Sequence, residues 1–496
     1  MKNQAQLIAY VDRLPGGTFR DLRQLLDGPL DGAFGGVHVL PFFHPIDGVD
    51  AGFDPIEHMQ VDHRVGTWAD VAALAAETEV MADLIVNHIS RHSSRFLDYD
   101  TRGNNSPYEG MFLTYVRVFP QGARESDLLA LYTIRPSLPF SIHDATHGAR
   151  LLLWTTFTSD QIDIDVMHPE GRRYLAEVLT RFHDAGIRII RLDAVGFAIK
   201  KAGTSCFMIP ETFAFIDELT AQAHALGIDV LVEVHGHPDD QIAVARHADW
   251  VYDFALPPLV LHALYTRNVM ALKRWLSMRP ANAVTVLDTH DGIGIQDVDR
   301  DRRRPDADPL LSRADIDALI DTIDQRSRGE SGLASGAAAS NVDASQINCT
   351  IYDALGRRDN EYLIARAIQC FVPGIPHIYY VGLLAGANDM DLLRRTRVGR
   401  DINRRYYTSA ALQQALARPV VQSLLALLRL RNTHPAFAGT FEASATAQDR
   451  LALTWTHGND VAQLDVDLAA MTASIRSSDT GGGNAEAWRT LLEAQA

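Results

Sequence analysis

Eight short apolar runs recur along this chain of 496 residues, and a segment of helical periodicity separates most of them from the next. The runs cover residues 6–11, 36–41, 80–87, 187–193, 229–235, 250–254, 283–288 and 375–381. Strands that alternate with helices favour a parallel sheet, because parallel neighbours require a crossover connection. Eight such units favour closure into a (β/α)₈ TIM barrel over an open sheet. The predicted fold class is therefore α/β.

Several of the helical segments carry start and stop signals. Thr67 precedes one of them and Asp70 follows three residues later, which is the spacing of a capping box. The segments 169–186 and 210–227 both begin with proline and end with glycine. Proline suits the first turn of a helix, and glycine suits the position just after the last turn. We therefore expect helices in these places.

Two connections are too long for plain barrel loops, and the pattern changes again near the carboxyl terminus. The intervals 88–167 and 292–355 are rich in turn-forming or charged residues, and long loops in compact enzymes are usually lids or binding loops. Beyond residue 436 the chain shows short stretches of alternating polarity, which predict strands. The predicted barrel comprises 1–87, 168–291 and 356–435, with inserted subdomains at 88–167 and 292–355 and a small C-terminal β domain at 436–496.

Composition narrows the choice of partners and compartment. The chain has 62 acidic against 46 Lys and Arg residues, and its formal net charge of −16 disfavours a nucleic acid or an anionic membrane as partner. No apolar run approaches the roughly 18 residues of a membrane span, and the N-terminal stretch lacks the apolar core of a signal peptide. The three cysteines are far apart, as is common in reducing compartments. We expect a cytoplasmic protein.

Polar residues gather at the ends of four of the predicted strands. The clusters contain Asp83, Asn87 and His88; Arg191 and Asp193; Glu233 and His235; and Asp288, His290 and Asp291. A single polar residue after a strand is more often a cap or a satisfied core group, and Arg191 with Asp193 alone equally fits a structural ion pair. Barrels bring the carboxyl ends of all strands to one mouth, so four clusters together predict a single site there.

The chemistry that suits these residues is glycosyl transfer. An oxocarbenium-like transition state requires one carboxylate beneath the anomeric carbon and one protonated carboxyl beside the departing oxygen. Asp193 is expected to be ionised by the charge of Arg191 and to act as the nucleophile. Glu233, flanked by two valines, is expected to hold and donate a proton. Asp291 is expected to bind sugar hydroxyls more tightly in the transition state than in the ground state.

A metal site is the weaker alternative for the same set of side chains. The chain contains no HExxH sequence, and the EVHGH sequence at 233–237 lacks two histidines four residues apart on one helix. We therefore expect neither a metal ion nor a cofactor.

Longer strings carry a resemblance to a known family. They are DAGFDPIEH at 50–58, FTSDQIDID at 157–165, IRLDAVGFAIKKAGTSCFM at 190–208, VTVLDTHDGIGI at 284–295 and GRDINRRYY at 399–407. Together they resemble the sucrose phosphorylase family, which belongs to the α-amylase superfamily of glycoside hydrolases, along nearly the whole chain. The resemblance implies a retaining double displacement in which inorganic phosphate takes up the glucosyl group. It also implies that the calcium ion of the amylases is absent.

The resemblance implies a role for each matching residue. The implied nucleophile, general acid/base and transition-state stabiliser are Asp193, Glu233 and Asp291. The implied substrate-binding residues are Asp50, Phe53, His88, Phe157, Gln161, Arg191, His235, His290, Asp343 and Arg400. Those implied on the phosphate or acceptor side are Arg135, Phe197, His235 and Ser345.

Departures from the family pattern lie on the acceptor side. Members that use sucrose commonly carry tyrosine where this chain has Phe197, and larger residues where it has Ala344 and Ser345. The implied substrates are sucrose and inorganic phosphate, and glucosylglycerol is the alternative glucosyl donor. A hydrolase or transglucosidase of the superfamily would share the three carboxyl groups, whereas a non-catalytic sugar-binding relative is expected to lack one of them. Relatives are often homodimers, so a homodimer is a further expectation.

Overall fold

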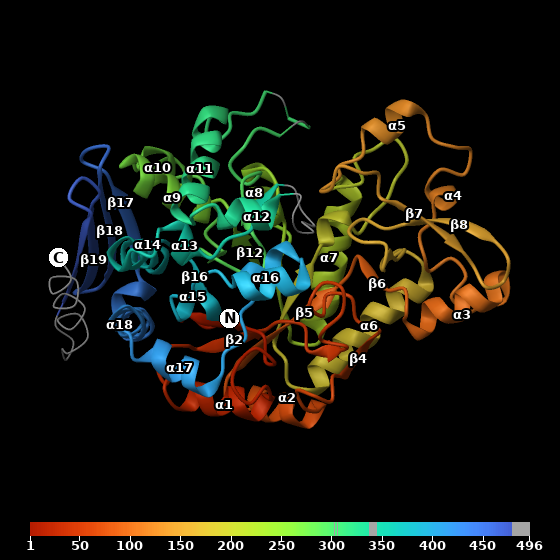
Figure 1. Ribbon diagram of the computed structural model, residues 1–496, viewed down its shortest axis with the longest axis horizontal. Coiled ribbons are helices and arrows are strands. Elements are labelled where there is room, and N and C mark those ends of the chain that lie inside the picture. Colours follow the sequence, from red (N-terminus) through yellow and green to blue (C-terminus); the bar gives the residue numbers. More distant parts are fainter. Residues whose placement is uncertain (302, 305, 337–344, 479–496) are drawn as a thin grey trace.

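Eight parallel strands close into a barrel at the centre of the computed structural model, which describes residues 1–301, 303–304, 306–336 and 345–478 (Figure 1). The strands are β1 (Gln6–Ala9), β2 (Gly36–Val39), β5 (Glu79–Ile85), β10 (Ile189–Asp193), β11 (Asp229–Val232), β12 (Trp250–Asp253), β13 (Ala283–Thr285) and β16 (Ile375–Tyr379). A parallel pair between β1 and β16 closes the ring. The predicted (β/α)₈ barrel is confirmed, and each of the eight apolar runs supplies one strand.

Several strands are shorter than predicted at their carboxyl ends. β11 stops at Val232, just before Glu233, and β13 stops at Thr285. At the mouth of a barrel the backbone leaves the hydrogen-bonded ladder and enters the loops that form the site. The polar residues of the predicted clusters therefore lie in the last strand positions or just beyond them.

Helices connect the barrel strands and surround them. They are α1 (Phe19–Asp27), α2 (Trp68–Ala75), α6 (Pro169–Asp184), α7 (Pro210–Ala225), α8 (Pro238–Val244), α9 (Leu256–Thr266), α10 (Met270–Leu276), α14 (Asp359–Phe371), α15 (Tyr380–Leu383), α16 (Met390–Thr396), α17 (Ser409–Leu416) and α18 (Pro419–Thr433). The predicted capping box is present, since the Thr67 hydroxyl accepts from the Asp70 amide and the Asp70 carboxylate accepts from the Thr67 amide. Gly186 and Gly227 follow α6 and α7 with φ of 80° and 70°, a backbone region that favours glycine.

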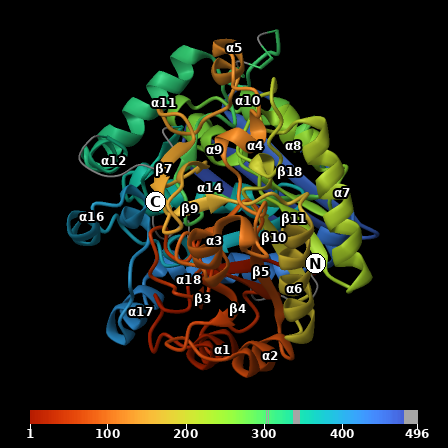
Figure 2. The same cartoon turned by 90° about the vertical axis from the view of Figure 1, so that its right-hand side faces the viewer.

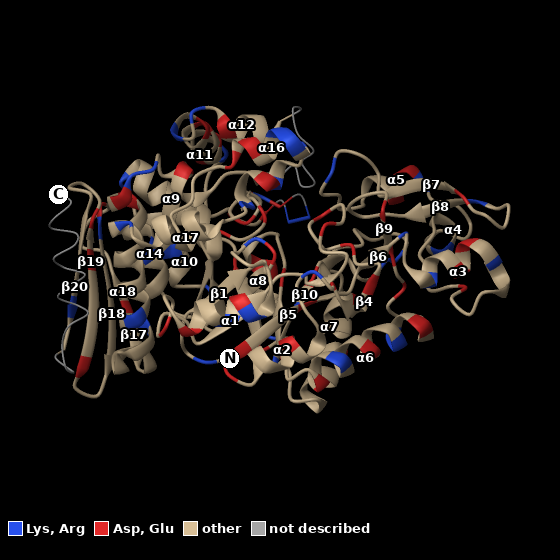
Figure 3. Ribbon diagram, turned by 60° about the horizontal axis from the view of Figure 1, so that its bottom comes forward, with Lys and Arg blue, Asp and Glu red and all other residues tan. Residues whose placement is uncertain are grey.

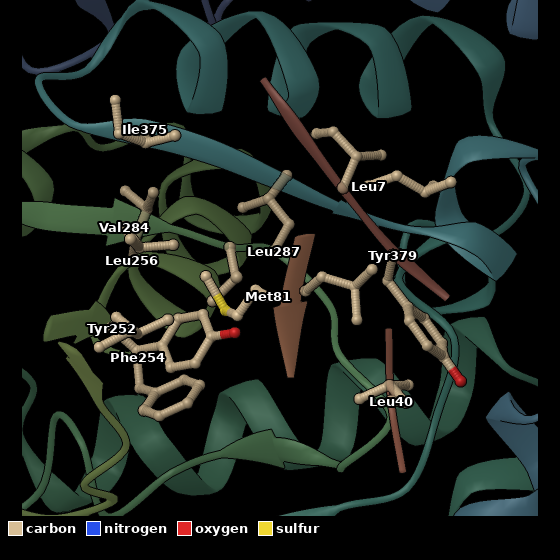
Figure 4. Close-up of a cluster of buried hydrophobic side chains, with 14 of the residues drawn as sticks. Leu7, Leu40, Met81, Tyr252, Phe254, Leu256, Val284, Leu287, Ile375 and Tyr379 are labelled. Atoms are coloured by element: carbon tan, nitrogen blue, oxygen red, sulfur yellow. The ribbon is translucent and has the colours of Figure 1, made fainter. Parts of the chain in front are cut away.

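Buried apolar side chains from different strands pack together in and around the barrel (Figure 4). Leu7 of β1, Met81 of β5, Tyr252 of β12 and Val284 of β13 are each at most 2% exposed. A barrel of eight strands is just wide enough to be filled by side chains, so a site is expected at the mouth, where the strands end.

Two groups of elements interrupt the alternation of strands and helices. The first group lies between β5 and α6 and comprises β6 (His88–Ser90), α3 (Ser94–Arg102), η1 (Gly103–Asn105), α4 (Tyr115–Val118), α5 (Glu125–Leu129), β7 (Phe140–Asp144), β8 (Arg150–Trp154) and β9 (Gln161–Asp163). The second lies between β13 and α14 and comprises β14 (Ile293–Gly294), α11 (Arg313–Arg326), α12 (Glu330–Ser335), β15 (Gln346–Ile347) and α13 (Ile351–Ala354). Both groups fall within the intervals that the sequence predicts as insertions.

Shorter elements complete the loops at the barrel mouth and the link to the last sheet. They are β3 (Phe43–His44), β4 (Glu57–Val61), η2 (Val195–Phe197), η3 (Gly399–Asn403) and η4 (Pro435–Ala438). β3 and β4 form an antiparallel pair.

A four-stranded antiparallel sheet follows the barrel, on the opposite side from the first insertion (Figures 1 and 2). Its strands are β17 (Thr440–Ser444), β18 (Arg450–His457), β19 (Asp460–Asp467) and β20 (Thr472–Ser477). Leu453, Leu464 and Ile475 are buried beneath it, and the Trp455 indole N–H donates to the Phe371 carbonyl of α14 at 2.6 Å. The predicted C-terminal β structure is thus present and packs on the barrel.

Acidic and basic side chains are interleaved along the chain and over its elements (Figure 3). Within the described part of the chain, no helix combines the length and the apolarity that crossing a bilayer requires.

A buried carboxylate at the end of β12 provides a test of this architecture. Asp253 is 1% exposed and accepts from the Trp275 indole at 2.8 Å and from the Arg279 guanidinium at 2.7 Å. Asp253→Ala leaves a buried cation without its partner, so the free energy of unfolding should fall by about 3 kcal/mol or more. Urea unfolding measures this change. As the control, Asp391→Ala removes an exposed Asp–Arg pair and should change stability by less than about 0.5 kcal/mol. Equal effects would contradict the proposed role of burial.

Candidate active site

The carboxyl ends of the barrel strands surround an open cavity. Many of the predicted site residues line it: Asp50, Phe53, His88, Phe157, Gln161, Asp193, Phe197, Glu233, His235, His290, Asp291 and Arg400. The structure therefore brings together residues of strand ends and loops that are up to 350 positions apart in the sequence.

A single buried guanidinium lies among three carboxylates below the cavity. Arg191, whose side chain is 2% exposed, donates to Asp83 at 2.5 Å and to Asp193 at 2.9 Å. Its other terminal nitrogen lies 3.4 Å from Glu233. Arg191 and Asp83 are direct neighbours in the parallel register of β10 and β5, so the barrel itself sets this contact. Arg191 is thus both an ion-pair residue and a support of the site.

Asp193 and Glu233 lie against the same guanidinium. Burial is the largest influence on Asp193 and raises the pKa of its carboxyl. Arg191 lowers that pKa but does not outweigh burial together with the neighbouring carboxylates. The sequence argument considered Arg191 alone and expected an ionised Asp193, so it left out the effect of burial.

The backbone turns sharply directly after Asp193. Ala194 has φ of 54°, a left-handed conformation that costs a residue with a β-carbon roughly 1–2 kcal/mol. Its amide donates to Glu233 at 2.9 Å. Strained residues of this kind gather at functional sites, where the surrounding structure holds them. Here the hydrogen bond from the strained Ala194 connects the end of β10 to Glu233, which follows β11.

A second group of charges faces the first from across the cavity. Arg400 lies 2.8 Å from Asp291 and 3.4 Å from Asp50, and Arg404 lies 3.2 Å from the same Asp50. Burial alone would raise the pKa of Asp291, but the charge of Arg400, with further contributions from His235 and Arg191, outweighs it and lowers the pKa strongly. Burial also raises the pKa of Asp50, and the two arginines reverse this effect. Both carboxylates are therefore ionised.

Aromatic rings and neutral imidazoles form the remaining walls. Phe53 stacks on His290 with ring centroids 4.6 Å apart, and Phe157 meets His88 edge to face at 5.2 Å. Burial lowers the pKa of His290 to about 3, so this imidazole is neutral at pH 7. The His88 Nε2 lies 2.8 Å from the Phe53 carbonyl, which orients the ring. Apolar walls with a few directed polar groups are typical of sugar-sized ligands.

Comparison with known proteins agrees with this geometry. The family profile "Alpha amylase, catalytic domain" matches residues 32–247. A sucrose phosphorylase from Agrobacterium vitis is 55% identical over 96% of this chain and 98% of its own length, and one from Bifidobacterium adolescentis is 49% identical over 97% of each. The chain belongs to the sucrose phosphorylase family. The crystal structure of sucrose 6F-phosphate phosphorylase from Thermoanaerobacter thermosaccharolyticum, 38% identical, superposes with a TM-score of 0.88 over 97% of this chain and 98% of that one.

Two described residues that the family resemblance implies on the phosphate or acceptor side, Arg135 and Ser345, are not among the residues that line the cavity. Arg135 donates to the Thr155 carbonyl at 2.6 Å, and its neighbour Ile134 lines the cavity instead. Ser345 follows the part of the second insertion that is not described, and its carbonyl accepts from the Ile295 amide. Asp343 and Ala344 lie outside the described residues. The roles of these residues stay predictions.

The cavity also has lining residues that the sequence argument missed. These are Ile134, Ala194, Gly196, Phe207, Val234, Gln296 and Gln346. Phe207 lies in the family string at 190–208, and Arg404, which holds Asp50, lies in the string at 399–407, so both could have been found there. Gln296 lies in the second insertion, and its side chain accepts from Tyr132 of the first insertion at 2.8 Å. No sequence pattern marks such a contact between two loops.

Among the residues that the structure describes, two groups of side chains have ligand atoms within 4.8 Å of one another, as a metal site requires. They are Glu233 with His235 and Asp291, and His44 with Asp62 and His63. In the first group, burial lowers the pKa of His235 but Asp297 outweighs it and raises the pKa to about 9, and an imidazolium has no lone pair for a metal. In the second group, Arg64 already donates to both oxygens of Asp62. Neither donor set suits a metal ion.

Metal content tests this conclusion. After dialysis against a chelator, the protein should retain less than about 0.1 equivalent of any divalent metal by elemental analysis, and its unfolding temperature should not change. Added calcium or zinc should leave the unfolding temperature unchanged as well. A retained equivalent of metal, together with a lower unfolding temperature on chelation, would contradict this interpretation.

Proposed function

We propose that this protein is a sucrose phosphorylase, an enzyme that transfers the α-glucosyl group of sucrose to inorganic phosphate and releases fructose and α-glucose 1-phosphate. The main support is the arrangement of Asp193 and Glu233 on one buried guanidinium, with Asp291 lining the same cavity. Two carboxyl groups that hold a proton between them can supply a nucleophile and an acid. The nearly full-length relatives named above support the same assignment.

The first half of the proposed reaction forms a covalent glucosyl-enzyme. Asp193 forms a bond to the anomeric carbon while the bond from that carbon to the fructosyl oxygen breaks, and Glu233 gives its proton to that oxygen. The reactive form therefore has an ionised Asp193 and a proton on Glu233. Arg191 donates to Asp193 at 2.9 Å and stabilises the ionised form of that carboxyl.

The second half transfers the glucosyl group to phosphate. A phosphate oxygen forms a bond to the anomeric carbon, the bond to Asp193 breaks, and Glu233 takes back a proton from the incoming phosphate. Two displacements at one carbon retain its configuration, so α-glucoside gives α-glucose 1-phosphate. Asp291, held ionised by Arg400, stabilises the positive charge that develops on the sugar ring in both halves.

The closed end of the cavity suits a glucosyl ring. Asp50 is fixed by Arg400 and Arg404 and can accept hydrogen bonds from ring hydroxyls. The stacked pair of Phe53 and His290 offers an apolar face to the carbon side of the sugar. These contacts are the same for every α-glucoside, so they determine the glucosyl half of the specificity and leave the leaving group undetermined.

The leaving group is selected at the open side, near Phe197 and the second insertion. Phe197 lines the cavity and packs on Phe207 with ring centroids 4.6 Å apart. Phenylalanine offers no hydroxyl there, so fructose is held by other polar groups.

We also propose a cytoplasmic location and a homodimer. The location rests on composition, and the homodimer rests on analogy with relatives.

The assay of four reactions tests the function directly. Release of glucose 1-phosphate is measured from sucrose and from glucosylglycerol, each with and without inorganic phosphate. Phosphate-dependent release that is faster from sucrose is expected. Faster release from glucosylglycerol would reassign the leaving group, and release of free glucose without phosphate dependence would make the enzyme a hydrolase.

The two catalytic carboxyl groups should be distinguishable by mutation. Asp193→Ala and Glu233→Gln should each lower turnover of sucrose by roughly 10³-fold or more while the fold is kept. α-Glucosyl fluoride needs no proton on its leaving group, so it should partly restore the glucosylation step in Glu233→Gln and not in Asp193→Ala. The control Glu211→Gln removes an exposed carboxylate and should leave turnover unchanged. A variant that keeps more than about a tenth of the activity would remove its residue from the mechanism.

Arg135 provides a separate test of phosphate binding. Arg135→Ala should raise KM for phosphate about tenfold more than KM for sucrose, because the cation would favour only the anionic substrate. Arg150→Ala in β8 removes an exposed arginine of the same insertion and serves as the control. Equal changes in both KM values would show that Arg135 only supports its loop through Thr155.

A further inference from the structure

The imidazole of His235 is fixed from two sides. Its ring stacks on Phe254 with centroids 3.8 Å apart and an interplanar angle of 17°. Its Nδ1 lies 3.1 Å from the Asp297 carboxylate, which belongs to the second insertion. These two contacts determine both the position and the rotation of the ring. The opposite nitrogen, Nε2, must therefore point toward the cavity that His235 lines.

Among the described residues, the buried Nε2 atom has no hydrogen-bond partner. It lies 3.6 Å from Glu233 and 3.9 Å from Asp291, which is too far for a hydrogen bond to either carboxylate. A buried donor without a partner costs free energy, so such a group in a native structure indicates a ligand or another unmet role. The position between the two carboxyl groups is where an incoming acceptor would approach the anomeric carbon.

Asp297 is itself held firmly. It is fully buried, and its carboxylate also accepts from the Gly236 amide at 3.0 Å and from the Gln241 side chain at 3.2 Å. A β-carbon at Gly294 would lie 2.0 Å from the Asp297 carboxylate and 3.3 Å from the His235 ring, so only glycine fits at 294. The packing of the second insertion thus places the Asp297 carboxylate against the Nδ1 atom of the His235 imidazole.

We infer that Asp297 is a positioning residue that keeps His235 as an imidazolium, with its Nε2–H directed between Glu233 and Asp291 to bind the incoming phosphate. The inference rests on the proposed function, and it specifies how the site admits a dianion beside its carboxylates. Asp297 touches neither substrate nor reacting atoms, and it acts through His235.

The charges around His235 explain why this cation matters for phosphate. Three carboxylates face the ring: Glu233 from the end of β11, Asp291 from the loop after β13, and Asp297 from the second insertion. Arg191 already lies against Glu233, and Arg400 against Asp291. In the described part of the chain, the imidazolium therefore offers the ligand a charged donor that no carboxylate already occupies. Water, as a neutral acceptor, gains much less from it than a phosphate dianion.

The protonation of His235 sets the pH range in which it can bind phosphate as a cation. Burial lowers its pKa, but Asp297 first, and then Glu233 and Asp291, raise it to about 9, above the ordinary value of 6.5. The charge is therefore present below about pH 9 and is lost as the pH rises through that value. Asp297→Asn removes the main cause of the raised pKa and keeps an amide oxygen for the Gly236 amide. The pKa should then fall toward 6.5, where only about 3% of the imidazole is charged at pH 8.

The experiment compares Asp297→Asn with wild-type enzyme over pH 6 to 10. kcat/KM for phosphate should fall about tenfold or more at pH 8, and its basic limb should move to lower pH by at least about one unit. Hydrolysis of α-glucosyl fluoride without phosphate should change less than about threefold, because that reaction lacks the anion. The control is Asp299→Asn, which removes a carboxylate two residues away that pairs with Arg313. It should leave both phosphorolysis and hydrolysis unchanged.

Two further measurements keep the result interpretable. The unfolding temperature shows whether Asp297→Asn is folded. His235→Gln should abolish the basic limb of the pH profile. Adding Asp297→Asn to His235→Gln should then change kcat/KM for phosphate very little, because the two residues act as one unit. A wild-type enzyme without phosphate-dependent release of glucose 1-phosphate would overturn the proposed function. A phosphate-dependent wild type with an unchanged basic limb in folded Asp297→Asn would overturn this inference alone.

Discussion

Three buried carboxylates surround one buried guanidinium, and this excess of negative charge constrains the rest of the site. Arg191 lies within 3.4 Å of Asp83, Asp193 and Glu233. Removing this cation would take the nearest positive charge from Asp193 in a medium of low polarity. Arg191 therefore both stabilises the barrel mouth and holds the two proposed catalytic carboxyl groups on one support.

The excess of negative charge also explains the use of the two insertions. A phosphate dianion must approach these carboxylates, so further cations have to come from outside the barrel strands. Arg400 lies in η3, and Asp297 of the second insertion stabilises the positive charge of His235. On the other side, Lys200 lies 2.8 Å from Asp163 of the first insertion and holds it to the loop after β10. Buried ion pairs thus connect each insertion to the catalytic strands.

Much of the site could be predicted because its residues follow directly from the strands. Asp193 ends β10 and Glu233 follows β11, so a pattern that finds the strands also finds these carboxyl groups. The contacts between loops could not be predicted in this way. Gln296 meets Tyr132 across 164 positions, and neither residue is part of a periodic pattern. The raised pKa of Asp193 was also beyond the sequence, because burial is its largest cause and, together with carboxylates from other strands, outweighs the neighbouring Arg191.

The sequence by itself determined the barrel, its insertions and the identity of the three carboxyl groups, because strand periodicity, helix caps and strand-end position are local properties. Only the tertiary structure decided how charge is distributed among them. Asp83 joins Arg191 through the register of two parallel strands, and Asp297 reaches His235 from an insertion 62 residues away. Electrostatic energy depends on separation in space and on burial, and neither can be obtained from the order of residues along the chain.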